Sequence, residues 1–531
     1  MGSEMCIRDR RVSFSGVSFE GITSFYRTTF NKIAHFERVN IKNADFTFCN
    51  FLDEVTFEGA EFGRLKFNYT TFHKFTNFIE VKVKDVASFR DVKFLDDAKF
   101  IRTEFHRNAS FSEVKFSGLA DFSEVKFWSN VWFEESEFLK DALFRATRFY
   151  NDVSFENSFF KNADFSSATF FGSASFDEIK VKGNFIFRNV ETYLSPLEIA
   201  DKRISFRRVR FDSPGDVLFD NVSMYPFSFI HTDISRVRFM NVKWPEEMGG
   251  YMPYDGILYL LRYSRRFRKS YFRRARENIK GAIEVIKDIL EKLDKPLSVE
   301  DINTIRELVG LVLSYGDKIF EKLRDISEYL SKTMKRFENF ADWEKYLLSR
   351  IENDYDLTLE NVLSVYRYLR ENYDYFLKYE ESGKFFVGEM EIKRQSFRIV
   401  KREFLANRGS HLKMVHVRME RALHWFVYSV YKLLALYGES YLRPLLFMML
   451  TVLIFSFVKA CLTYSISNLG ELGNFMYSVF LGDSFWYSLR VFFQLISPSE
   501  PYFIFERLFA LLILSCLYIA LRRKLERRIR H

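Results

Sequence analysis

A short polar segment near the end of the chain lies between two apolar stretches. It contains residues whose side chains could line a path for ions. Four of its side chains offer oxygen atoms: Gln494, Ser497, Ser499 and Glu500. Oxygen ligands suit hard cations, and rings of such side chains can line a selective pore. One chain supplies only one of each, so a pore of this kind would need several copies around an axis. The same residues also suit an ordinary loop at a membrane surface, and the sequence leaves both interpretations open.

The patterns of enzyme chemistry are absent from the sequence. It has no phosphate-binding glycine loop, no nucleophile elbow and no HExxH motif among its eight histidines. Glu389 and Glu391 stand two residues apart, so a helix would point them to different sides, which favours ion pairs between packed helices. The four cysteines lie far apart, which favours neither disulfides nor a zinc site. We therefore expect no catalytic site, no metal site and no cofactor.

A strongly basic segment covers residues 262–276. It carries eight basic residues and no acidic one, interleaved with Tyr263, Phe267 and Tyr271. Three interpretations stay open: contact with anionic lipid headgroups, nucleic-acid binding, and a solvated helix that pairs with nearby acids. The residues predicted for a membrane surface are Arg262, Arg265, Arg266, Arg268 and Lys269 here, with Arg522, Arg523 and Lys524 near the end of the chain.

Two apolar stretches in the C-terminal part are long enough to cross a lipid bilayer. The first is predicted over residues 443–464 and the second over residues 503–521, which makes about 29 Å of helix. Basic residues precede the first, and a basic tail over residues 522–531 follows the second. This distribution of basic residues favours a cytoplasmic location for the start of the first membrane helix and for the end of the second. We therefore expect a multi-pass protein of the cell membrane, with the N-terminal domain and the C-terminal tail in the cytoplasm; two buried helices of a soluble bundle are the alternative.

The connection between these two stretches is too apolar for a free loop. Residues 483–496 are predicted to form a re-entrant or pore-like helix that stays within the membrane boundary. Two helices with a re-entrant helix between them are the layout of a two-helix pore module. A potassium filter of the Thr-Val-Gly-Tyr-Gly type needs left-handed backbone and hence glycine, and no glycine follows Gly482. Any conduction would therefore depend on side chains.

The N-terminal half is dominated by phenylalanine, of which the chain contains 63. From Phe89 to Phe160 the rings follow one another in alternating steps of five and six residues. Each unit predicts a very short strand followed by a corner, and about four such units close a coil of roughly 20 to 22 residues. Neighbouring coils bury one another's faces, at about 2 kcal/mol for each ring. The rings predicted for the core include Phe100, Phe111, Phe122, Phe133 and Phe144.

The blocks GLADFSEVKF (residues 118–127) and KNADFSSATF (residues 161–170) resemble the pentapeptide-repeat family in its phenylalanine-centred form. The resemblance implies a right-handed quadrilateral β-helix, which we place over residues 11–245. Residues 1–10 depart from the repeat and are expected to be a non-native leader. An aromatic-rich β-sandwich with coincidental spacing is the alternative.

Beyond the repeat, apolar residues recur every three or four positions among lysines and glutamates, which predicts a charged α-helical domain or linker over residues 255–440. Within it, residues 365–373 and 381–391 resemble a helical module that joins the solenoid to channel-like helices in membrane-bound pentapeptide-repeat proteins. Tyr437 to Ser440 and Tyr487 to Leu489 resemble the potassium-channel-like C-terminal ends of such proteins. The implied fold is a solenoid, an α-helical region and a two-span transmembrane helical hairpin.

Three functional hypotheses follow. The first is an oligomeric membrane protein with an ion-channel-like module that conducts ions, in which the solenoid is a sensor or an interaction platform for an unknown protein. The second is a non-conducting, membrane-tethered scaffold. The third is a soluble DNA mimic that binds topoisomerases, as some family members do. Such mimicry needs an acidic outer face, whereas residues 11–244 carry 32 basic and 32 acidic residues. The third hypothesis is therefore disfavoured, and nucleic acid is not an expected partner.

Overall fold

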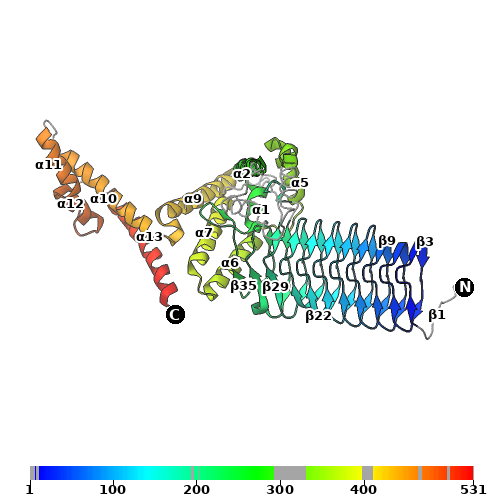
Figure 1. Cartoon of the computed structure of the whole chain (residues 1–531). Helices are drawn as coiled ribbons and strands as arrows, with labels where there is room; N and C mark the ends of the chain where they lie inside the picture. The colour runs from blue at the N-terminus through cyan, green and yellow to red at the C-terminus, as the bar shows by residue number, and fades with distance from the viewer. Residues whose placement is uncertain are drawn as a thin grey trace. The chain divides into compact units, whose positions relative to one another are not determined.

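Stacked short strands form a solenoid of about ten turns in the N-terminal half of the chain, as a computed structural model shows (Figure 1). The predicted β-solenoid is thereby confirmed. Its strands pair in parallel in two large sheets, of 19 and 16 strands among the described residues. The structure describes residues 6–7, 11–192, 196–200, 203–291, 331–397, 411–463, 469–498, 501 and 503–529.

Most strands are only two residues long, because the chain turns a corner after each of them. The 19-stranded sheet contains β1 (Cys6–Ile7), β2 (Val12–Ser13), β4 (Thr29–Phe30), β5 (Ala34–His35), β7 (Asn50–Phe51), β8 (Val55–Thr56), β10 (Thr71–Phe72), β11 (Thr76–Asn77), β14 (Lys93–Phe94), β15 (Ala98–Lys99), β18 (Lys115–Phe116), β19 (Ala120–Asp121), β22 (Glu137–Leu143), β25 (Phe159–Asp164), β28 (Lys180–Val181), β29 (Phe185–Arg188), β32 (Arg210–Phe211), β33 (Val217–Asp220) and β35 (Arg238–Met240). The 16-stranded sheet contains β3 (Ser18–Ser24), β6 (Asn40–Asp45), β9 (Glu61–Lys66), β12 (Lys82–Val83), β13 (Ala87–Ser88), β16 (Glu104–Phe105), β17 (Ala109–Ser110), β20 (Lys126–Phe127), β21 (Val131–Trp132), β23 (Arg148–Phe149), β24 (Val153–Ser154), β26 (Thr169–Phe170), β27 (Ala174–Ser175), β30 (Glu191–Thr192), β31 (Ile204–Ser205) and β34 (Phe227–Ser228). Two further short strands are β36 (Glu246–Glu247) and β37 (Gly250–Tyr251). β1 falls within the range predicted to be a leader, and its backbone pairs with β4.

The phenylalanine rings stack along the inside of the solenoid. Phe122 lies 4.7 Å from Phe100 and 5.1 Å from Phe144 between ring centroids, with nearly parallel planes. The rings of adjacent stacks meet edge to face, as Phe111 and Phe122 do at 5.4 Å. Offset-stacked and edge-to-face contacts are the arrangements that aromatic rings prefer. Each turn therefore builds the core together with its neighbours.

Two kinds of corner explain the alternating steps of five and six residues. Each five-residue step contains one residue with left-handed backbone, such as Arg102 at φ 58° between Phe100 and Phe105. The six-residue step from Phe116 to Phe122 instead contains Gly118, where an added Cβ would lie 2.3 Å from the backbone of Asp96. The corner with the left-handed residue therefore closes with one residue fewer than the other kind of corner.

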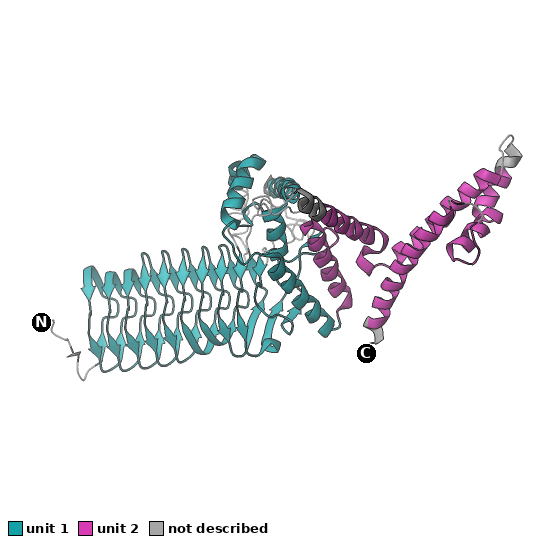
Figure 2. Ribbon diagram, turned by 180° about the vertical axis from the view of Figure 1, so that it is seen from behind, with its two compact units in different colours: residues 1–247, 251–377 teal, residues 248–250, 378–531 magenta. Residues whose placement is uncertain are grey.

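Helices cover the C-terminal end of the solenoid within a first compact unit, residues 1–247 and 251–377 (Figure 2). The Trp343 indole donates to the carbonyl of Leu197 at 2.9 Å. Asn372 donates to two carbonyls of the last turn, those of Ile234 and Val237. These bonds fasten the helices to the backbone of the solenoid. The elements are the 3₁₀ helices η1 (Pro196–Glu198) and η2 (Pro214–Asp216), and α1 (Tyr254–Tyr263), α2 (Arg265–Glu291), α5 (Phe340–Ile351) and α6 (Leu359–Tyr375).

The second compact unit comprises residues 248–250 and 378–531 and is helical (Figure 2). Its buried core includes Val452, Phe492, Ala510 and Ile513. The elements are α7 (Tyr379–Ser396), α9 (His411–Ala435), η4 (Leu436–Gly438), α10 (Leu442–Thr463), α11 (Leu469–Phe480), α12 (Asp483–Phe492) and α13 (Phe503–Ile529).

Two helices of this unit are long and apolar enough to cross a membrane. They are residues 442–463 and 503–526, close to the predicted ranges. Only 17% and 28% of their most apolar windows are buried within the structure, whereas the core helix of a soluble protein is mostly buried. Most of their apolar side chains therefore face outward.

Candidate functional site

A buried polar contact lies among the apolar helices of the second unit. Ser488 of α12 lies between α10 and α13, with its Oγ 3.0 Å from the carbonyl of Val452. The same Oγ is in hydrogen-bond contact with a carboxyl oxygen of Glu506 on α13. Ser488 and Glu506 are both fully buried. An ionisable group inside a candidate membrane span is a functional-site candidate by its position alone.

The hydrogen bonds around Glu506 fit a neutral carboxyl group. Ser488 has one proton, and two acceptors compete for it. If Glu506 is protonated, its O–H donates to Ser488, which donates to the carbonyl of Val452, and both bonds are satisfied. Among the described residues the second carboxyl oxygen, Oε2, has no partner. A buried carboxylate with a single donor would be costly.

Three more serines hold α11 against α10 and α12 against α11. Ser456 of α10 donates to the carbonyl of Val479 at 2.7 Å, and Ser478 of α11 donates to Ser484 of α12 at 2.8 Å. All three side chains are buried. Because a hydrogen bond in an apolar bundle has no water to replace it, these contacts fix the position of α12.

The loop after α12 contains the predicted pore residues. Gln494 has left-handed backbone at φ 62°, and its side chain is exposed, as is that of Ser497. Arg507 of α13 holds the loop through a hydrogen bond to the carbonyl of Ile496. Ser499 and Glu500 lie outside the described residues. The described candidates, Gln494 and Ser497, are therefore exposed, whereas the buried contact between Ser488 and Glu506 involves residues that were not predicted as site residues.

A second polar cluster lies where α7 meets α9. The Glu391 carboxylate on α7 accepts from Lys432 Nζ of α9 at 3.0 Å and from Tyr437 Oη at 3.1 Å, and it pairs with Arg394. Burial by itself would raise the pKa of Glu391, but the Arg394 hydrogen bond and the charges of Lys432 and Arg394 outweigh burial and hold the pKa below its ordinary value. Glu391 is therefore a buried ion-pair centre.

The turn between α9 and α10 joins this cluster to the end of α13. Three consecutive residues, Leu436, Tyr437 and Gly438, have left-handed backbone. Arg523 Nη1 donates to the Tyr437 carbonyl at 2.7 Å, and the Arg523 guanidinium lies 4.1 Å from the ring centroid of Phe386 on α7. The end of α13 and the helix α7 thus hold the same turn from two sides.

The basic residues predicted for a membrane surface have different surroundings. Arg262 donates to the carbonyls of Glu352 and Asp354, and Arg268 is buried against Glu344 at 2.8 Å. Arg265 also approaches Glu344, at 3.4 Å, while Arg266 and Lys269 are exposed. At the end of the chain, Arg522 pairs with Glu526, Lys524 lies over the Tyr441 ring, and Arg523 binds the turn described above. Arg262, Arg268 and Arg523 therefore hold parts of the protein together.

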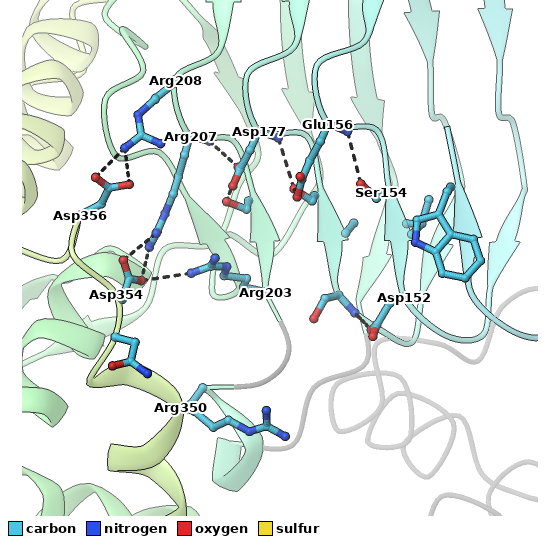
Figure 3. A pocket seen from close by; sticks show the side chains of 18 of the residues that line it. Asp152, Ser154, Glu156, Asp177, Arg203, Arg207, Arg208, Arg350, Asp354 and Asp356 are labelled. Carbon is cyan, nitrogen blue, oxygen red and sulfur yellow. Dashed lines mark hydrogen bonds and ion pairs between the residues drawn. The ribbon is translucent and has the colours of Figure 1, made fainter. Parts of the chain in front are cut away.

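A polar groove of about 810 Å³ lies on the first unit, where residues 350–356 face the last turns of the solenoid (Figure 3). Three successive outward positions are serines, at Ser154, Ser175 and Ser205, and their small size leaves the hollow. Trp132, one turn earlier at the same position, also lines it.

Arginines and aspartates close the groove at one side (Figure 3). The guanidinium of Arg207, with 6% of its side chain exposed, binds both oxygens of Asp354 at 2.8 and 2.7 Å. Burial would raise the pKa of Asp354, but the Arg207 hydrogen bond and the nearby positive charges outweigh burial and lower that pKa. Arg208 forms a more exposed pair with Asp356, in which its Nη2 donates to both carboxylate oxygens at 2.7 Å.

On the solenoid wall of the groove, the carboxylates of Asp152 and Glu156 are exposed. They accept hydrogen bonds from Ser173 and Ser175, and neither forms an ion pair with a described residue. With Trp132 beside them, they offer a surface suited to a cationic group. Within the described ranges, no group of three or more histidine, cysteine, aspartate or glutamate side chains could hold a metal ion.

Comparison with known proteins identifies one family. Residues 78–126, 100–148 and 133–180 match the family model described as "Pentapeptide repeats (9 copies)". These matches lie within the solenoid, and none reaches the second unit. The comparisons with curated proteins and with solved structures found no match.

Proposed function

Since the N-terminal half of the chain is a pentapeptide-repeat solenoid followed by two candidate membrane-spanning helices, we propose that the protein is a membrane-anchored, oligomeric assembly with an ion-conducting module. The solenoid acts as its sensor or interaction platform. The observation that carries the proposal is the position of α12 between α10 and α13.

α12 is too short to cross a bilayer, because its ten residues make about 15 Å of helix. Its Ser488 lies against Val452, near the midpoint of α10. The chain then turns and begins α13 at Phe503. This course of the chain supports the proposal that α12 is a re-entrant helix.

The loop after α12 supports assembly into an oligomer. Leu495 is 72% exposed in the single chain, and Gln494 and Ser497 are exposed beside it. Irregular backbone at membrane depth is tolerated only where protein covers it or where it lines a water-filled cavity. Several copies around an axis would supply both the protein that covers this backbone and a water-filled cavity, with the polar side chains facing the axis.

The charges at the ends of the spans support the proposed orientation. Arg443 lies in the first turn of α10, and Arg522, Arg523 and Lys524 lie in the last part of α13. Because the two helices run in opposite directions, these basic residues share one end of the pair, which the positive-inside rule places in the cytoplasm. The N-terminal domain and the C-terminal tail then share that side.

The groove beside Trp132 supports the role proposed for the solenoid. Its exposed carboxylates, Asp152 and Glu156, could receive a cationic group of a protein partner. Elsewhere on the solenoid, acidic and basic side chains pair from turn to turn, as Arg90 does with Glu113 and Lys115 with Glu137. These mixed charges disfavour a DNA mimic, because the outer face of such a mimic would be acidic.

A non-conducting scaffold is the second candidate. It is favoured by the bond from Arg507 to the carbonyl of Ile496, which ties the loop down, and by the lack of glycine after Gly482. Such a scaffold would use the same membrane helices only as an anchor.

Current recording in planar bilayers separates the two candidates. We expect cation current from the reconstituted full-length protein, and we expect Glu500→Gln to reduce it about three- to tenfold at low ionic strength, because a ring of carboxylates concentrates cations at a pore mouth. The reduction should shrink at high salt, which screens the ring. Glu526→Gln, which removes an exposed carboxylate at the other end of α13, is the matched control and should change the current little. The absence of current in all preparations would exclude conduction and leave the scaffold.

A further inference from the structure

The helix α9 has an apolar stripe that no described part of the chain covers. Its side chains recur at helical spacing, and between 53% and 67% of each is exposed. At about 100° per residue, these five positions fall within an arc of about 120°, so they lie on one side of the helix. The stripe consists of Met419, Leu423, Phe426, Val427 and Leu433.

The opposite side of α9 is the one that packs on the protein. Trp425 lies under the Arg394 guanidinium at 5.8 Å, Tyr428 meets the Phe397 ring at 5.3 Å, and Lys432 binds Glu391. A helix on the surface of a soluble domain does the reverse, with its apolar side inward. The outward stripe on α9 therefore fits an apolar surrounding.

The stripe is continuous with the candidate membrane-spanning helices. At the C-terminal end of α9, Leu434 and Ala435 belong to the buried cluster that contains Val452 of α10 and Ala510 of α13. Six residues separate α9 from α10, in which Leu442 and Leu446 are exposed. The surface that would face lipid on α10 thus extends onto α9.

We propose that α9 lies in the membrane interface, with the stripe from Met419 to Leu433 inserted at the boundary between headgroups and acyl chains. The proposal rests on the membrane placement of α10 and α13 in the proposed function. Such helices bury their apolar side about 5–10 Å deep and keep their polar side toward water or protein. α7, bound to that polar side through Glu391, is thereby held close to the lipid surface.

Fluorescence quenching by lipids tests this placement in the full-length protein. In a background with Cys6→Ser and Cys461→Ser, which removes the N-terminal thiol and the exposed thiol of Cys461, single cysteines carry an environment-sensitive fluorophore at Phe426 (Phe426→Cys) or at Ile454 on α10 (Ile454→Cys). Glu124→Cys on the solenoid is the aqueous control. The protein is reconstituted in phosphatidylcholine vesicles with nitroxide lipids that carry the quencher near the headgroups or near the bilayer centre.

At Phe426 we expect about threefold stronger quenching by the shallow lipid than by the deep lipid, since interfacial helices lie near the headgroups. Ile454 should show the opposite order, and Glu124 should show no lipid quenching. Quenching at Ile454 without quenching at Phe426 would overturn the interfacial placement and leave the membrane spans intact. A Phe426 label shielded from both lipid and aqueous quenchers would overturn it in favour of a second copy on this face. No lipid quenching at Ile454 would refute the proposed function itself.

Discussion

Replacing Glu391 with alanine should speed amide hydrogen exchange in α7 about a hundredfold in the reconstituted protein, which corresponds to about 3 kcal/mol of lost local stability. Glu391 is the carboxylate between Arg394 and Lys432, and it also accepts from Tyr437. Its removal leaves the two positive charges of Arg394 and Lys432 facing each other and takes one hydrogen-bond partner from the Tyr437 hydroxyl. The measurement is hydrogen–deuterium exchange of peptides from α7, compared with peptides from the solenoid.

Glu526→Ala is the matched control for this variant. The Arg522–Glu526 pair is on the same unit but exposed, and exposed pairs contribute about 0–1 kcal/mol. Exchange in the control should therefore stay close to that of the wild type. Equal exchange in Glu391→Ala and the wild type would show that the cluster does not hold α7.

The same contact should respond to acid. Because the folded pKa of Glu391 is below its ordinary value, its contribution is fully present above the unfolded pKa of about 4.3 and is lost as the pH falls through the lower folded value. Protection of α7 should therefore drop in strong acid in the wild type. Glu391→Gln, which cannot ionise, should remove the part of this drop that Glu391 causes.

Replacing Asp354 with asparagine should destabilise the covered end of the solenoid by about 3–5 kcal/mol, because it leaves the buried Arg207 guanidinium without its bidentate partner. The change should appear as faster amide exchange in β31 and β34. Arg203, which also approaches Asp354 at 3.3 Å, loses the same partner. Glu113→Gln breaks the exposed pair with Arg90 and is the control, with little expected effect.

A double replacement separates the charge from the shape of this contact. Arg207→Met combined with Asp354→Leu removes both charges and should restore most of the lost protection, since well-packed apolar residues often substitute for a buried ion pair. If Asp354→Asn alone left the exchange unchanged, other acids near Arg207, such as Asp177 and Asp255, would be its effective partners.

The solenoid could be predicted from the sequence because its information is local and repeated. The position of every ring from Phe89 to Phe160 follows one spacing, and each ring is buried by the turn before and the turn after. The reason for the alternating steps was not visible, because the left-handed corner accepts residues as different as Arg102, Glu124 and Ala146. The corner is therefore set by the stacking of the turns rather than by one residue type.

The polar contacts were less predictable because burial decides their role. Arg262, Arg268 and Arg523 have the residue type expected at a lipid surface, yet each one binds protein groups that come from another part of its own unit. Ser488 and Glu506 are 18 positions apart, and only the return of the chain after α12 brings them together. For this contact, the sequence offered one signal, the carboxylate of Glu506 near the start of the second apolar stretch. The outward stripe of α9 could likewise be recognised only once the position of α7 was known.

Alkaline extraction of membranes from cells that make the full-length protein tests the central claim most directly. If α10 and α13 cross the bilayer, the chain should stay in the membrane pellet at high pH and enter solution only with detergent, because each span buries about 20 apolar residues in lipid. Release of the intact chain into the supernatant without detergent would contradict this account.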